Sequence, residues 1–191
     1  MEAMTATMTT PAPISVADPT FAWTIQARSH EPVMRCFYCQ KCSIGCPTAF
    51  AMDYQPAQVL KMVQLGQKGA LLKSRAIWLC IGCETCGTRC PNDIRINNVM
   101  DVLKEIALEE GATPAEKTVY ALHRSFLNSI KRFGRLHELT MLAEYILHVP
   151  QKLPAEIGIG WALFVRGKVL HLWSAIKERG AVRKLFDRAG L

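Results

Sequence analysis

The sequence predicts a mainly α-helical protein in which helices surround two short cysteine loops. Half of its 191 residues are hydrophobic, which is enough to build one domain or two small ones. A spacer of 33 residues, 47–79, separates the two cysteine-rich runs, and its apolar residues recur at helical spacing. The last 80 residues show the same helical pattern. No sheet is required to build this chain.

One helix is expected before the second cysteine run and another after it. The first lies in AQVLKMVQLGQKGALL, where Pro56 is placed to open a helix and Gly66 and Gly69 interrupt it. The second covers residues 97–108, with Asn97 as its N-cap and Gly111 after its end. The apolar residues expected to face the core are Val59, Leu60, Val63 and Leu71 in the first helix and Val99, Val102, Leu103 and Ile106 in the second.

The C-terminal part is expected to contain three helices and a short final one. Thr113-Pro114-Ala115-Glu116 combines a capping box with proline at the first helical position, and it starts a helix that stops near Gly134. A second helix runs from about 135 to 147, a third from roughly 157 to 178, and residues 181–190 add one or two turns. The apolar stripe of the first of these helices is Val119, Leu122, Phe126, Leu127 and Ile130.

These elements divide the chain into three parts. Residues 1–30 are rich in Ala, Thr and Pro and hold no Lys or Arg before Arg28, so we expect a flexible tail without a signal peptide. Residues 31–111 form the domain that carries the cysteines, and residues 112–191 form a helical extension. The longest apolar run, 157–165, is far shorter than the roughly 20 residues that span a bilayer. We therefore expect a cytoplasmic protein.

Charge distinguishes the two larger parts. Residues 1–111 contain 10 Lys or Arg and 10 Asp or Glu, whereas residues 112–191 contain 13 and 6, so the net charge of +7 lies in the extension. The basic residues are spread along helices, and no nucleic-acid-binding motif is present. We therefore expect the extension to dock on a partner protein rather than on nucleic acid. An ordinary solvated basic face is the alternative.

All eight cysteines fall into two copies of one pattern, CFYCQKCSIGCP and CIGCETCGTRCP. Each copy has the spacing C-x2-C-x2-C-x3-C-P, which holds a [4Fe–4S] cluster in bacterial ferredoxins. Three thiolates two residues apart can converge from one tight loop, and Pro47 or Pro91 then leads the chain away. The sequence therefore predicts two [4Fe–4S] clusters and an electron carrier. The ligands are Cys36, Cys39, Cys42 and Cys46 in the first run and Cys80, Cys83, Cys86 and Cys90 in the second.

The fourth cysteine of each run is expected to bind the cluster of the other run, as in ferredoxins with two clusters. Such an exchange would join residues far apart in sequence into one unit. One cluster would be held by Cys36, Cys39, Cys42 and Cys90, and the other by Cys80, Cys83, Cys86 and Cys46.

Two other uses of the cysteines stay open. Four thiolates also bind structural zinc, which would make the chain an interaction adaptor without a redox role. Zinc sites usually take two ligands from each of two loops, however, and three cysteines at this spacing fit that scheme poorly. A disulfide framework would need an oxidising compartment, which nothing in the sequence indicates. The five histidines show no paired spacing, so none is assigned to a metal or to acid–base chemistry.

Three further segments indicate which group of iron–sulfur proteins the chain resembles. They are PAQVLKMVQLG at 56–66, Trp78-Leu79-Cys80 leading into the second run with Arg89-Cys90-Pro91 closing it, and SFLNSIKRFGR at 125–135 followed by His137-Glu138-Leu139. Over about residues 31–190 the chain resembles the C subunit of heterodisulfide reductases. It departs from that pattern at Phe37-Tyr38, where a Gln before Cys39 is expected. The cysteine motifs alone are shared with iron–sulfur subunits of succinate dehydrogenases, fumarate reductases and glycolate oxidases, which stay as the alternative.

The resemblance implies a helical ferredoxin domain with a relay function. In that family the C subunit passes electrons between a flavin- and cluster-bearing A subunit and a B subunit, whose cysteine-rich motifs hold the catalytic clusters that act on a disulfide. This chain has no C-C-G motif, no G-x-G-x-x-G fingerprint and no spare cysteine. The resemblance therefore implies a non-catalytic electron-transfer subunit of a larger oxidoreductase complex, with no catalytic residues of its own.

Overall fold

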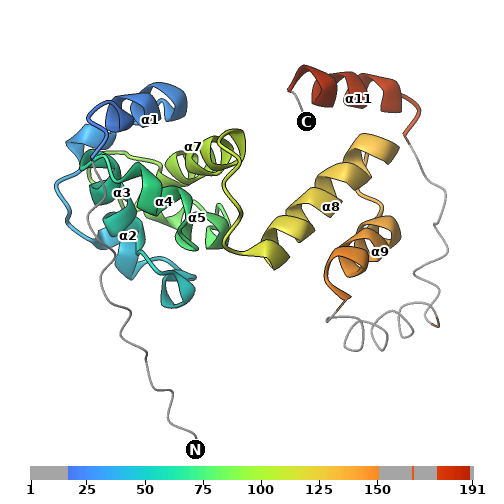
Figure 1. The fold of residues 1–191 in the computed structure, drawn as a ribbon, viewed down its shortest axis with the longest axis horizontal. Coiled ribbons are helices and arrows are strands. Elements are labelled where there is room, and N and C mark those ends of the chain that lie inside the picture. Colours follow the sequence, from blue (N-terminus) through green and yellow to red (C-terminus); the bar gives the residue numbers. More distant parts are fainter. Residues whose placement is uncertain (1–16, 151–164, 166–175, 190–191) are drawn as a thin grey trace, which may run out of the picture. The chain divides into compact units, whose positions relative to one another are not determined.

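The computed structural model describes residues 17–150, 165 and 176–189. The chain divides into two compact units, Met1–Ala115 and Glu116–Leu191. Every regular element in the described part is a helix, so the predicted mainly α fold class is confirmed (Figure 1). Within the same residues, none of the helices combines the length and the apolar character needed to cross a membrane.

The first unit packs five helices around the two cysteine loops. Helix α1 contacts α3 and α7, α4 contacts the same two helices, and α5 contacts α7. The side chains of Ile25, Leu60, Leu71, Ile77 and Leu103 lie at the centre of this packing and are almost inaccessible to solvent. The elements are α1 (Phe21–Ser29), η1 (Val33–Arg35), α2 (Lys41–Ile44), η2 (Ala49–Ala51), α3 (Pro56–Gln64), α4 (Lys68–Leu72), α5 (Ala76–Leu79), α6 (Thr85–Thr88) and α7 (Ile96–Glu109).

Both helices predicted around the second cysteine run are present as α3 and α7. Helix α3 begins at Pro56, and the backbone N–H of Gln55 donates to the side chain of Gln58 at 2.8 Å. The predicted N-cap of α7 was wrong, because the helix begins at Ile96 and its N-cap is Arg95. All eight apolar residues expected to face the core are buried, namely Val59, Leu60, Val63, Leu71, Val99, Val102, Leu103 and Ile106.

Part of the segment predicted to be a flexible tail forms a helix instead. Residues 1–16 lie outside the described part, but residues 21–29 form α1, in which Phe21 and Ile25 are buried. Burying each such side chain contributes about 1.5–3 kcal/mol, which explains why this segment is ordered. The guanidinium of Arg28 also donates to the carboxylates of Glu105 and Glu109 on α7, at 3.2 Å and 2.7 Å.

Gly66, after the end of α3, allows the segment before α1 to approach closely. The backbone N–H of Asp18 donates to the carbonyl of Gly66 at 3.0 Å. Gly66 has φ +68°, and a Cβ placed there would lie 2.3 Å from the carbonyl oxygen of Asp18. Only glycine therefore fits this position without displacing the chain that leads into α1.

We predict that G66A destabilises the first unit more than G111A. The two glycines have φ +68° and +67°, but a Cβ at residue 111 would meet nothing within 4 Å. Backbone strain should cost about 1–2 kcal/mol at either position. The clash with Asp18 adds to this loss only at residue 66. Denaturant midpoints of the two proteins, measured without oxygen, check this, and equal losses would show that the Asp18 contact does not hold α1.

A buried carboxylate fixes the start of α7. Glu31 is only 7% exposed, and its Oε2 accepts a hydrogen bond from the backbone N–H of Arg95 at 2.8 Å. Its Oε1 accepts from the side-chain amide of Asn98 at 2.7 Å. A negative charge at this place also complements the helix dipole. Glu31 thus ties the segment before the first cysteine run to the helix after the second.

We predict that E31A lowers the free energy of unfolding by about 2–3 kcal/mol, because it leaves two part-buried donors without their charged acceptor. The conservative change E31Q should restore part of this loss. The matched control is E105A, which removes a 62% exposed carboxylate from the Arg28 ion pair and should cost under about 1 kcal/mol. Thermal unfolding followed by circular dichroism provides the measurement. Equal effects of E31A and E105A would contradict the role given to Glu31.

The second unit contains α8 (Lys117–Phe133), α9 (Glu138–His148) and α11 (Arg179–Arg188) among its described residues, and α8 packs against both of the others. Helix α8 ends at Gly134, whose φ is +75°. The hydroxyl of Ser129 accepts a hydrogen bond from the backbone N–H of His137 at 2.8 Å, which fixes the turn between α8 and α9.

Several predicted details of this unit were wrong. Helix α8 begins at Lys117 with Glu116 as its N-cap, so residues 113–116 are not a capping box. The buried residues of α8 are the small Ala121, Ser125 and Ser129, which allow close helix approach, whereas three residues of the predicted stripe are about 40% exposed. Helix α9 starts three residues later than predicted. The helix predicted over 157–178 falls mostly outside the described residues. The exposed stripe residues are Leu122, Phe126 and Leu127.

Candidate metal centres

The two cysteine loops have the same backbone shape. In the first loop Tyr38 and Gln40 adopt left-handed φ values of 62° and 63°, and in the second loop the matching residues Gly82 and Glu84 have 64° and 58°. A short helix follows each loop, α2 after Gln40 and α6 after Glu84, and these two helices contact each other. Non-glycine residues adopt left-handed φ at a cost, and such strain clusters at functional sites. The repeated geometry therefore indicates that the two loops have the same function.

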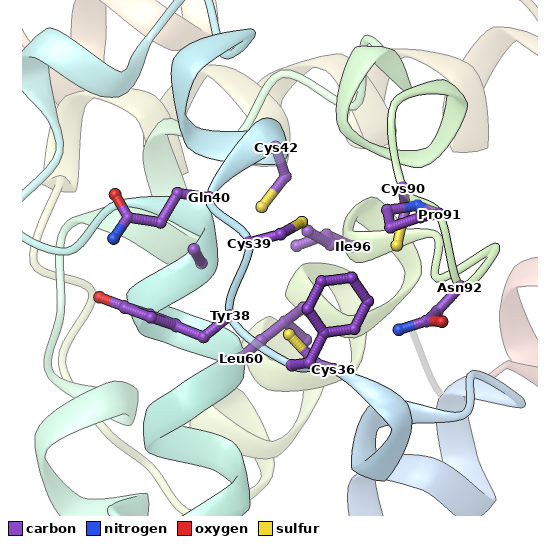
Figure 2. A pocket seen from close by; sticks show the side chains of 12 residues that line it. Cys36, Tyr38, Cys39, Gln40, Cys42, Leu60, Cys90, Pro91, Asn92 and Ile96 are labelled. Carbon is purple, nitrogen blue, oxygen red and sulfur yellow. The ribbon is translucent and has the colours of Figure 1, made fainter.

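The first hollow is lined by four cysteines that come from both runs. Cys36, Cys39 and Cys42 lie on the first loop, and Cys90 reaches the hollow from the end of the second run, beside Pro91 and Asn92 (Figure 2). The space measures about 320 Å³, including its open mouth. Its apolar wall is formed by Ala57, Leu60 and Ile96.

The second hollow repeats this arrangement with the two runs exchanged. Cys80, Cys83 and Cys86 line it from the second loop, and Cys46 lines it from the end of the first run. It measures about 370 Å³, including its mouth. Ile96, the first residue of α7, lines both hollows, so the two sites share a wall. All eight predicted ligands therefore lie around two neighbouring spaces, whereas none of the described histidines lines either of them.

Side-chain hydrogen bonds hold the loops in place. The amide of Gln64 on α3 donates to the carbonyls of Val33 and Cys36, both at 3.0 Å, and the amide of Asn92 donates to the carbonyl of Arg35 at 2.6 Å. Asp53 accepts from the backbone N–H groups of Arg75 and Ala76 at 2.7 and 2.8 Å, which caps the helix leading into Cys80. Neither Gln64 nor Asp53 shows a sequence signal, because each acts on a distant segment.

Two helix N-termini are directed at the hollows. Ala57 at the start of α3 lines the first hollow, while Pro56 and Asn97, at the starts of α3 and α7, line the second. The partial positive charge at a helix N-terminus stabilises anions such as thiolates. The backbone N–H of Asn97 also favours the thiolate form of Cys86 and partly offsets the effect of burial on its pKa.

Burial opposes ionisation of several of these thiols. It raises the pKa of Cys42 to about 11 and also raises the pKa values of Cys80 and Cys86. Cys83 is exposed, and a hydrogen bond from Thr85 lowers its pKa. Because metal ligation requires thiolates, binding iron at the buried cysteines releases protons, and it provides the compensating positive charge that burial demands.

The two hollows differ in one charge. Gln40 lines the first, and Glu84, at the matching position, lines the second. Among the described residues that line either hollow, Glu84 is the single charged side chain apart from the cysteines. The side-chain amide of Asn97, at the start of α7, donates to its carboxylate at 3.5 Å. Figure 2 shows the amide of Gln40 directed away from the sulfur atoms of the first hollow.

Comparison with known families identifies the fold of this region. Residues 32–94 match the family model described as a 4Fe-4S dicluster domain. This segment therefore resembles a 4Fe-4S dicluster domain, and it is called the dicluster domain below. The matched segment contains all eight cysteines that line the hollows, so the predicted cofactors, two [4Fe–4S] clusters, are confirmed for the dicluster domain. When bound, each cluster stores and releases one electron.

The chain is related in sequence to the C subunits of heterodisulfide reductases, as predicted. It is 38% identical over 88 residues to the C subunit of ferredoxin:CoB-CoM heterodisulfide reductase from Methanosarcina acetivorans, covering 46% of this chain and 35% of the relative. It is 32% identical over 104 residues to an iron–sulfur C subunit of CoB–CoM heterodisulfide reductase from Methanocaldococcus jannaschii, covering 54% and 52%.

A third relative is the C subunit of H(2):CoB-CoM heterodisulfide,ferredoxin reductase from Methanothermobacter thermautotrophicus. It is 29% identical over 103 residues, which cover 53% of this chain and 56% of the relative. The chain thus matches between about a third and just over half of the length of these relatives. The similarity therefore covers only part of each protein.

We predict that E84Q raises the reduction potential of one cluster, because it removes a negative charge beside the electron to be added. The expected shift is roughly 40 mV, equivalent to about 1 kcal/mol for a one-electron couple. The reciprocal change Q40E should lower the potential of the other cluster by less, since that side chain points away from the sulfurs. A redox titration followed by electron paramagnetic resonance (EPR) measures both. If both variants shift the reduction potential of the same cluster, the assignment of Glu84 and Gln40 to separate clusters is wrong.

Proposed function

We propose that this protein is the electron-transfer subunit of a heterodisulfide reductase-like complex. The observation that carries the proposal is the pair of four-cysteine hollows that share Ile96 as a wall. Two one-electron sites that both border Ile96 form a short path through the domain. The relationship to the C subunits supports a place in a multi-subunit oxidoreductase.

We propose the exchanged ligand set for the two clusters. One is bound by Cys36, Cys39, Cys42 and Cys90, and the other by Cys80, Cys83, Cys86 and Cys46. The composition of the two hollows supports this choice, because each contains three cysteines of one run and the last cysteine of the other. The apolar walls limit the access of water to the clusters, while Cys39 and Cys83 leave one exposed edge on each.

The relay is proposed to connect two partner subunits in the cytoplasm. Electrons enter from a flavin- and iron–sulfur-containing subunit of the A type and leave to a disulfide-reducing subunit of the B type, or pass in the reverse direction. Substrate chemistry belongs to the B-type partner, since all eight cysteines of this chain are assigned to clusters and none is left to attack a disulfide. Reducing conditions in the cytoplasm keep thiolate ligands from forming disulfides.

Anaerobic purification tests the proposal. We expect a brown protein with about eight irons, whose two clusters are reduced in one-electron steps seen by EPR. Rapid mixing of the reduced protein with a B-type subunit should then oxidise both clusters. A colourless protein containing zinc would overturn the proposal in favour of an adaptor. Oxidation by a flavoprotein of the succinate dehydrogenase type, and not by a B-type subunit, would place the chain in the alternative complex.

The exchanged ligation predicts which single substitutions act on the same cluster. C90S and C39S should remove or alter one EPR signal, and C46S and C83S should remove or alter the other. The reason is that each pair supplies ligands to one hollow. Spectra of the four variants, each reduced with dithionite, provide the comparison. If C90S instead changes the signal that C83S changes, each run holds its own cluster and the exchange is wrong.

A further inference from the structure

The second unit contains a strongly basic hollow that the relay does not use. It lies between the end of α8 and the start of α11 and measures about 1220 Å³, including its open mouth. Except for Gly180, every residue that lines it is cationic: Lys131, Arg132, Lys177, Arg179 and Arg183. Five positive side chains around one concavity repel one another, so an anion bound among them would reduce this repulsion.

Carboxylates of the chain neutralise only part of this charge. Lys131 pairs with Asp187 at 3.4 Å, and Arg132 pairs with Glu144 at 3.7 Å. Within the described residues, no ion pair involves the remaining three cations, which are exposed. The exposed Glu178 adjoins two of them in sequence but does not line the hollow. Residues 151–164 and 166–175, outside the described part, contain one carboxylate against three Lys or Arg.

We propose that this hollow is the docking site for an acidic segment of a partner protein. The inference rests on the proposed function, because it supplies the contact that a relay subunit needs. Two carboxylates of the chain already pair with the cations of the hollow, so the site accepts groups of this geometry. Arginine binds carboxylates through two parallel N–H donors, and two of the three remaining cations are arginines.

The shape favours a protein segment over a membrane surface. A flat layer of lipid headgroups meets the most protruding cations of a protein, whereas these five line a concavity that an extended acidic peptide can enter. Docking through charge also increases the rate of association, which suits a partner that exchanges electrons repeatedly. The site lies in the basic extension, far in sequence from the cysteine ligands, so contact and electron transfer use separate residues.

A substitution at Gly180 tests the docking proposal without disturbing the fold. It lies in the first turn of α11, and a Cβ added there would meet nothing within 4 Å. A glutamate at this position places a carboxylate at the hollow and also complements the helix dipole, so G180E should fold at least as well as the native chain. The control G180A adds the Cβ without the charge.

The experiment measures binding of a fluorescent hexaglutamate peptide to the full-length protein with its clusters, at low salt. We expect G180E and the double variant R179Q/R183Q each to weaken binding about tenfold. G180A should leave the affinity unchanged. K184Q, which removes an exposed charge of α11 that does not line the hollow, should also have little effect. The same variants should slow cluster oxidation by the B-type subunit at limiting concentration, with the EPR spectra unchanged.

Three results would overturn the proposal. Equal losses with K184Q and R179Q/R183Q would show that only net charge matters. Binding to vesicles of equal parts phosphatidylserine and phosphatidylcholine that depends on these residues, without peptide binding, would assign the hollow to a membrane. Inorganic phosphate that binds in the hollow when the peptide does not would assign it to a small anion. In each case intact EPR signals and electron transfer to the B-type subunit leave the relay function standing.

Discussion

The first turn of α7 is the element on which the rest of the dicluster domain depends. Its first residue, Ile96, lines both hollows, and the next, Asn97, lines the second hollow and donates to Glu84. The buried carboxylate of Glu31 holds the start of this helix from the opposite side. A shift of α7 would therefore alter both metal centres at once. This explains why a charged residue is retained in the interior, where burial without partners would be costly.

The two cysteine loops have the same backbone conformation and differ in their side chains. The matching φ values at Tyr38 and Gly82, and at Gln40 and Glu84, place both sets of thiols in the same geometry. The difference in charge between Gln40 and Glu84 then acts on the clusters without changing that geometry. The hydroxyls of Thr48 and Thr85 lie 3.4 Å from the sulfurs of Cys46 and Cys83. Once these cysteines are thiolate ligands, the hydroxyls would donate to sulfur and raise the cluster potential, whereas the charge of Glu84 would lower it. Potentials in such a domain reflect the balance of these effects.

The sequence was sufficient to predict the cofactors and the buried faces of α3 and α7, because each of these leaves a periodic or motif signal. Helix α1 has almost no such sequence signal, because its burial depends on contacts with α3 and α7. Its large apolar side chain Trp23 is 60% exposed. The apolar stripe expected on α8 failed for a related reason. Close packing against α9 buries small residues such as Ala121 and Ser125, which hydrophobicity patterns do not select. Glu31, Asp53 and Gln64 were missed because each acts on backbone groups distant in sequence.

The exchange of the last cysteine between runs is the feature from which the proposed relay follows. It would make each cluster a cross-link between the segments before and after α3, in addition to the apolar core. Diffraction from anaerobic crystals, collected at the iron absorption edge, locates the two clusters and the sulfur atoms bound to them. We expect iron bonded to Cys90 in the hollow of Cys36, Cys39 and Cys42, and iron bonded to Cys46 in the other. A map with Cys46 bound beside Cys36, Cys39 and Cys42 would contradict the exchange.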